Sequence, residues 1–104
     1  MIYDIACADG RKIIERRCYS EVGDTVDVAE ASYTNSIGDA LLMAHWQDPD
    51  FDPQQRAFYY GRVIEIPNPR WTAYDAKFFD VTMPDGTAMK VQDRAYTSPI
   101  WYTP

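Results

Sequence analysis

Alternating apolar and polar residues predict short strands along most of the chain. The clearest segment is 57–66, AFYYGRVIEI, which is apolar on both faces and is therefore expected to be a central strand. Segment 40–46 is apolar except for His45 and is short for a helix. We predict a strand there, although its Ala, Leu and Met content leaves a helix open. Further strands are expected at 2–8, 11–17, 25–33, 87–92 and 100–102.

One segment has the spacing of a helix. Asn68-Pro69 is typical of a helix start, and Trp71, Tyr74 and Phe78 follow at i, i+3 and i+7. We predict a short helix over 70–79. The pattern as a whole predicts a mainly β fold: one small antiparallel, sandwich-like domain over 1–104 with one short helix.

The pairing of the first two expected strands decides whether the two cysteines can form a disulfide. Asp9-Gly10 is typical of a type I′ hairpin turn, and it places Cys7 opposite Lys12. In that register Cys18 lies opposite Met1, well away from Cys7. Two cysteines so far apart cannot form a disulfide, so the sequence predicts free thiols.

The net charge of the chain excludes some classes of binding partner. The chain carries 16 Asp and Glu against 10 Lys and Arg, a net charge of −6. A surface of that sign repels phosphate backbones and anionic lipids, which argues against nucleic-acid and membrane-surface binding. The chain has no long apolar run and no signal-peptide pattern, so we expect no membrane span and a cytoplasmic location with reduced cysteines.

Three alternating aspartates are the one candidate metal motif. Asp48, Asp50 and Asp52 resemble the start of an EF-hand loop, but Pro53 stands where glycine is needed and Tyr59 where a bidentate glutamate is needed. We expect a polar connector, with Asp52 capping a single turn and the others accepting from turn amides. A looser calcium site stays open, and no cofactor is expected.

No catalytic motif stands out. His45 is the only histidine, and with Cys7 and Cys18 it supplies at most three zinc ligands without the usual spacing. A nucleophile needs an adjacent base, and no pattern pairs His45 with a cysteine. The five glycines are isolated, so there is no phosphate-binding loop. We expect no enzyme activity.

Several strings of the chain resemble a known family. DPDFDPQQRAFYYGRVIEIPNPRWTAYDA (48–76) and QDRAYTSPIWYTP (92–104) are similar to the C-terminal end of large bacterial proteins of unknown function. The N-terminal part of longer members resembles the PHP class of metal-dependent phosphoesterases, whose His-rich metal motifs are absent here. Segment 25–104 fits well, the first predicted hairpin fits loosely, and 80–87 differs. The resemblance implies an accessory β-rich module without the phosphoesterase activity.

Aromatic residues are the most suggestive surface feature, at 14% of the chain. Most are expected in the core, and the rest on a partner or ligand surface. The sequence therefore favours a non-catalytic module that self-associates as a homodimer or docks on a protein partner. A small-ligand or carbohydrate-binding module is the alternative, and an enzyme with an unrecognised site ranks last. Candidate surface residues are Tyr59, Trp71, Tyr96, Trp101 and Tyr102.

Overall fold

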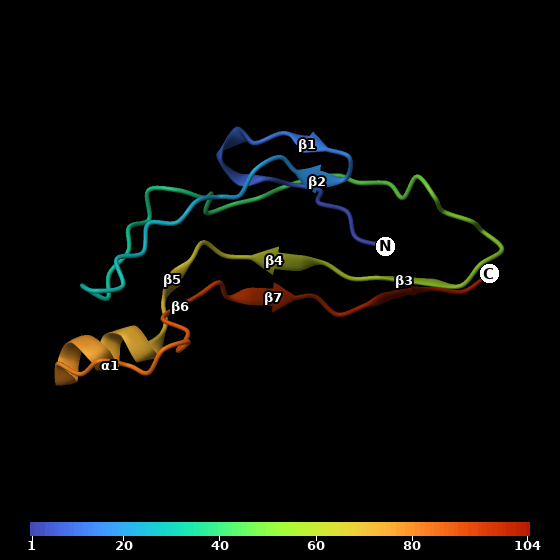
Figure 1. The fold of residues 1–104 in the computed structure, drawn as a ribbon. Coiled ribbons are helices and arrows are strands. Elements are labelled where there is room, and N and C mark those ends of the chain that lie inside the picture. Colours follow the sequence, from blue (N-terminus) through green and yellow to red (C-terminus); the bar gives the residue numbers. More distant parts are fainter.

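The C-terminal half of the chain forms one long antiparallel ribbon of two strands. The computed structural model describes residues 1–104, and Figure 1 shows the ribbon running from the C-terminus to the single helix. Three successive pairs of short strands build it. They are β3 (Ala57–Tyr59) with β8 (Ile100–Tyr102), β4 (Arg62–Ile64) with β7 (Arg94–Tyr96), and β5 (Asn68–Pro69) with β6 (Lys90–Val91).

Two bulges separate the three pairs. Between the first two pairs, residues 60–61 on one strand face residues 97–99 on the other, so the second strand has one extra residue. Between the next two, residues 65–67 face residues 92–93, and the extra residue lies on the first strand. Such bulges bend and twist a ribbon. The expected central strand over 57–66 is therefore broken, and each part has a single neighbour.

Helix α1 (Trp71–Phe79) fills the connection between β5 and β6, which confirms the helix predicted over 70–79. It ends where Asp80 adopts a left-handed conformation with φ 51°, and its N–H donates to the last turn. Thr72 and Ala73 are buried, and the Thr72 hydroxyl donates to the carbonyl of Ala88. The apolar stripe of Trp71, Tyr74 and Phe78 is exposed instead.

The N-terminal hairpin differs from the predicted one. Residues 8–10 form a 3₁₀ turn, and the chain then makes a hairpin with a two-residue turn between β1 (Ile13–Ile14) and β2 (Arg17–Cys18). Its turn residues, Glu15 and Arg16, both have positive φ. The strand predicted over 2–8 does not form: residues 2–7 pair with no strand, and Ala8 begins the 3₁₀ turn.

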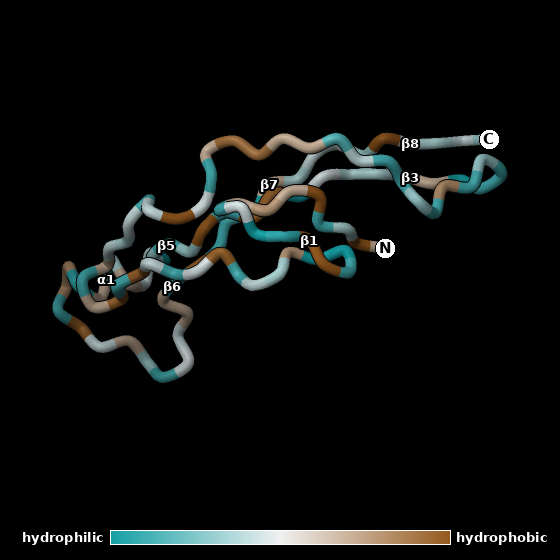
Figure 2. The backbone as a smooth tube through the Cα atoms, turned by 90° about the horizontal axis from the view of Figure 1, so that it is seen from above, coloured by the Kyte–Doolittle hydropathy of each residue, from teal (hydrophilic) through white to brown (hydrophobic).

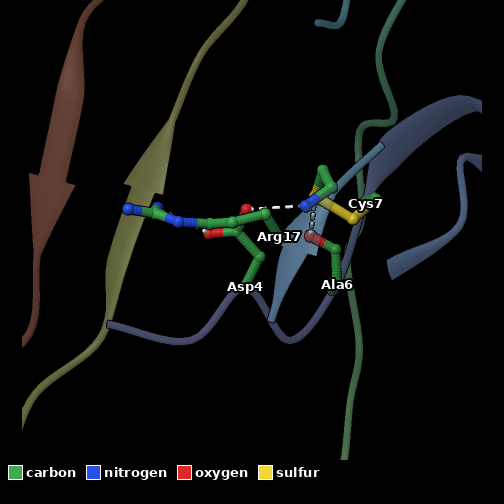
Figure 3. Close-up of polar contacts among 5 residues, drawn as sticks. Asp4, Ala6, Cys7 and Arg17 are labelled. Atoms are coloured by element: carbon green, nitrogen blue, oxygen red, sulfur yellow. Dashed lines mark hydrogen bonds and ion pairs between the residues drawn. A yellow bond between two sulfur atoms is a disulfide. The ribbon is translucent and has the colours of Figure 1, made fainter. Parts of the chain in front are cut away.

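The prediction of two free thiols is wrong: Cys7 and Cys18 form a disulfide, with their Cα atoms 5.9 Å apart (Figure 3). The added hairpin at Glu15 and Arg16 is the physical reason, because it carries Cys18 back beside Cys7. The Asp4 N–H donates to the Arg16 carbonyl at 2.8 Å, and the Cys18 N–H donates to the Asp4 carboxylate at 2.8 Å.

The remaining N-terminal segments are irregular. Residues 40–46 form neither the predicted strand nor the alternative helix, and within 25–33 only Asp27 and Ser32 make a bridge. Polar links hold this half beside the ribbon. Lys77 of α1 pairs with Glu30 at 3.1 Å, and Lys90 of β6 pairs with Asp24.

The structure contains almost no core. Only five residues are buried, and all are small: Ala8, Ala31, Pro69, Thr72 and Ala73. Apolar stretches are spread along the whole chain in Figure 2 instead of gathering in its interior. The mainly β class with one short helix is confirmed, and the strands form separate two-stranded antiparallel ladders. No helix reaches the length and apolarity that crossing a bilayer requires.

The disulfide should hold the N-terminal hairpin together. Closing a loop of this size by a disulfide typically stabilises a fold by about 2–4 kcal/mol. We expect Cys7→Ser/Cys18→Ser to lose protection of the backbone amide at position 18 in hydrogen exchange, with the amides of β4 and β7 unchanged as the internal control. Alkylation of the unreduced, denatured protein should find no free thiol. Two alkylated cysteines would contradict the bridge.

Candidate interaction surface

The two faces of the ribbon differ in what covers them. Phe58 lies opposite Trp101, so both side chains point to the same face. Tyr59 lies between Phe58 and Tyr60 and points to the other face, as does Tyr102. The N-terminal half packs against the face of Tyr59 and Tyr102.

Aromatic side chains line the open face. The ring centroids of Trp101 and Phe58 are 5.1 Å apart, those of Phe58 and Tyr60 6.2 Å, and those of Tyr60 and Tyr96 6.2 Å. Exposure is high throughout, from 54% at Phe58 to 72% at Trp101. The stripe therefore spans the first bulge without interruption.

Arginines continue this stripe toward α1. Arg62 lies opposite Tyr96, and Arg94 lies opposite Ile64 on the same face. Both arginines are exposed, and neither takes part in any of the three ion pairs of the chain. We call this surface the aromatic–arginine face, formed by Phe58, Tyr60, Arg62, Arg94, Tyr96 and Trp101.

The opposite face is partly covered by the chain itself. The Tyr59 hydroxyl donates to the Asp48 carboxylate at 2.7 Å, and Trp46 lies edge-on with its ring centroid 6.4 Å away. Tyr102 donates to the Pro53 carbonyl at 3.0 Å and contacts Phe51. Tyr59 and Tyr102 thus fix the segment around the aspartates, while Tyr96 and Trp101 remain on the open face.

Trp71, the fifth candidate, lies elsewhere. It is the first residue of α1 and is 62% exposed, together with Tyr74, Phe78 and Phe79. Helix α1 occupies the far end of the molecule from the C-terminus (Figure 1). These residues make a second apolar patch, separate from the aromatic–arginine face.

The three aspartates build a turn. Asp48 accepts from the N–H of Asp50 at 2.9 Å, and Asp52 accepts from the N–H of Gln54 at 2.8 Å, as expected for turn and cap residues. Asp50 accepts from the Tyr3 hydroxyl at 2.5 Å. The structure contains no group of three or more His, Cys, Asp or Glu side chains spaced to hold a metal ion.

His45 and the cysteines are not arranged for catalysis. His45 is exposed and makes no hydrogen bond or ion pair to an acidic side chain. The disulfide consumes both thiols, so neither Cys7 nor Cys18 is available as a nucleophile or metal ligand in this state.

The surface has six hollows, and two of them lie at residues named above. The larger, about 560 Å³, is wide open and lies between the end of α1, residues 81–89 and residues 28–30. The smaller, about 190 Å³, is lined by Tyr3, Trp46, Asp48, Asp50 and Tyr59. Ligand sites of small molecules commonly measure about 300–1,000 Å³ and are well enclosed, so neither hollow is typical of one.

Sequence reasoning overlooked Phe58, Arg62 and Arg94 as surface residues. The alternation in AFYYGRVIEI does place Phe58, Tyr60 and Arg62 on one face. That pattern was interpreted as part of a buried central strand. The signal for the surface was the unpaired charge of Arg62 within an otherwise apolar row.

The aspartates of this turn change the pKa values of the Tyr3 and Tyr59 hydroxyls. The hydrogen bond to Asp48 raises the pKa of Tyr59, and the hydrogen bond to Asp50 raises that of Tyr3. Ionised tyrosine cannot donate, and it would face a carboxylate. Because both pKa values are raised on folding, these bonds stabilise the fold at neutral pH and are lost as pH rises through the raised values.

We expect Asp48→Asn to lower the pKa of Tyr59 toward its ordinary value of 10.0 and to leave that of Tyr3 raised. Asp52→Asn is the matched control, because Asp52 accepts from a backbone amide and from no tyrosine. NMR titration of ring-labelled tyrosine resolves the two groups. An unchanged pKa of Tyr59 in Asp48→Asn would show that the hydroxyl does not bind this carboxylate.

Comparison with known proteins gives a family without an established role. No curated protein and no solved structure matches the chain. The model of one family, described as a protein of unknown function (DUF3604), matches residues 1–104. The match covers the N-terminal hairpin as well as the ribbon. The chain therefore belongs to the DUF3604 family of proteins of unknown function.

Proposed function

We propose that this chain is a non-catalytic interaction module that works by covering its open apolar surfaces against another protein surface. It does so by self-association or by docking on a partner. Its two exposed surfaces, the aromatic–arginine face and the patch on α1, are the contact regions. The observation that carries the proposal is the area that the chain leaves exposed.

The exposed area is too large for a self-sufficient domain. The chain exposes 8519 Å², whereas a folded monomer of 12.0 kDa exposes about 6,000 Å². The excess of about 2,500 Å² exceeds the roughly 800 Å² that one partner contributes to a standard interface, and it matches a large obligate one. The radius of gyration is 18.3 Å, whereas a compact domain of this length has about 13 Å, so the chain is also extended in shape.

The small number of backbone hydrogen bonds also supports an interaction role. The chain makes 30 backbone–backbone hydrogen bonds, where about 70 are typical of this length. A two-stranded ribbon alone is only marginally stable in water, and both of its edges present free donors and acceptors. A partner that adds a strand or covers a face would stabilise the ribbon.

Enzyme and ligand-binding roles have less support. The polar groups of the smaller hollow already bind one another, because Asp48 and Asp50 accept from Tyr59 and Tyr3. A bound sugar would have to displace those bonds. The resemblance of longer family members to phosphoesterases makes an enzyme part a suitable partner for such a module.

Solution scattering of the purified chain tests the proposal. We expect either an extended monomer with a radius of gyration near 18 Å or an association that grows with concentration. Phe58→Ser/Trp101→Ser should weaken that association or lower the binding of a hydrophobic dye. Ile2→Ser/Met43→Ser, which removes exposed apolar side chains outside both surfaces, is the control. A compact monomer near 13 Å that binds no dye would overturn the proposal.

A further inference from the structure

The aromatic–arginine face carries positive charge without a counter-charge. Arg62 and Arg94 belong to neighbouring cross-strand pairs, so they are diagonal neighbours, roughly 7–8 Å apart at their backbones. No carboxylate lies within ion-pair distance of either guanidinium. Two like charges so close repel one another, and a negatively charged neighbour would relieve the repulsion.

This local charge is opposite in sign to that of the whole chain, which is −6. Long-range attraction therefore cannot bring an anionic partner to this face, and recognition must depend on short-range contacts made once the surfaces meet. Trp, Tyr and Arg are also the residues that most often dominate binding energy at protein interfaces. The face combines all three.

Charge also argues against two other occupants. A second copy bound about a two-fold axis that passes beside the arginines would place Arg62 and Arg94 of each chain against those of the other, and such like-charge contacts are costly. A nucleic acid could stack on the aromatic rings, but its phosphates would meet the net negative charge of the rest of the molecule.

We propose that the aromatic–arginine face docks on a protein partner whose matching surface is apolar and places two carboxylates opposite Arg62 and Arg94. This inference rests on the interaction role proposed above. The carboxylates fit residues i and i+2 of an extended segment, which lie about 6.6 Å apart on one side of a strand. Arginine binds a carboxylate through two parallel hydrogen bonds, which fixes the register of the partner.

Two synthetic peptides serve as probes for the full chain. Both are extended and share the same apolar residues, and they differ only in carrying Glu or Lys at positions i and i+2. We expect the Glu peptide to bind and the Lys peptide to bind at least about tenfold more weakly, as judged by calorimetry. Equal binding of the two peptides, or binding of neither, would overturn the proposal.

Charge reversal then locates the site. Arg62→Glu/Arg94→Glu should reduce binding of the Glu peptide at least about tenfold and gain binding of the Lys peptide. Lys12→Glu/Arg70→Glu changes the net charge equally but alters exposed residues outside the face, so both affinities should stay within about twofold. Loss of binding in both variants would show that binding depends on the net charge of the chain and not on these two arginines, which would overturn the proposed site.

Two further measurements would reveal a nucleic acid or a second copy of the chain bound at this face. Binding of a single-stranded oligonucleotide that is lost in Arg62→Glu/Arg94→Glu would show a nucleic-acid surface and overturn the proposal. A change of oligomeric state in the same variant would show that a second copy occupies the face, which also overturns it. Neither result would contradict the interaction role, whose failure is recognised by a compact monomer in scattering.

Discussion

Cross-strand hydrogen bonding between two segments far apart in sequence is the interaction on which this structure depends. Residues 57–69 and 90–102 have no third strand beside them, and α1 with the loop 80–89 joins their ends. A ribbon of two strands has no interior, because every side chain points to one face or the other. The chain can therefore bury an apolar residue only where another segment lies against a face. The five buried residues, all small, follow from that geometry.

Polar bonds, together with aromatic contacts to Tyr59 and Tyr102, attach the N-terminal half to the ribbon. Asp24 and Glu30 pair with lysines near α1, and Asp48 accepts from Tyr59 near the other end. These links are exposed or partly exposed, and exposed ion pairs contribute little stability. The two halves are consequently joined by directional contacts that specify position more than they contribute energy. An additional surface against the open face would supply the missing apolar burial.

Local signals in the sequence predicted local structure well. The spacing of Trp71, Tyr74 and Phe78 located the helix, and the Asp52-Pro53 turn forms as expected. Asn68-Pro69 does not start the helix, because these two residues form β5 and the N-cap is Arg70. Asp9 and Gly10 do adopt positive φ, as in the predicted turn. The pairing failed because Glu15 and Arg16, which carry no turn signal, also adopt positive φ and make a second hairpin. A shift of a few residues then brought two cysteines together.

The pattern of apolar residues in the sequence could not predict which face of the ribbon the rest of the chain covers. The row Phe58, Tyr60 and Ile64 has the periodicity of a strand in a core, and nothing in it distinguishes a face covered by the same chain from one covered by another molecule. The apolar stripe of α1 is equally ambiguous. The candidate surface was therefore only partly predicted: Tyr96 and Trp101 lie on the open face, whereas Tyr59 and Tyr102 hold the aspartate turn.

The two bulges have a consequence for how this family can vary. One adds a residue to the second strand and the other adds a residue to the first, so the two length differences cancel along the ribbon. Each bulge absorbs its extra residue without turning the neighbouring ladder over. Insertions and deletions among relatives should accordingly gather at 60–61, 97–99, 65–67 and 92–93. Within a ladder, a single added residue would exchange its inner and outer side chains.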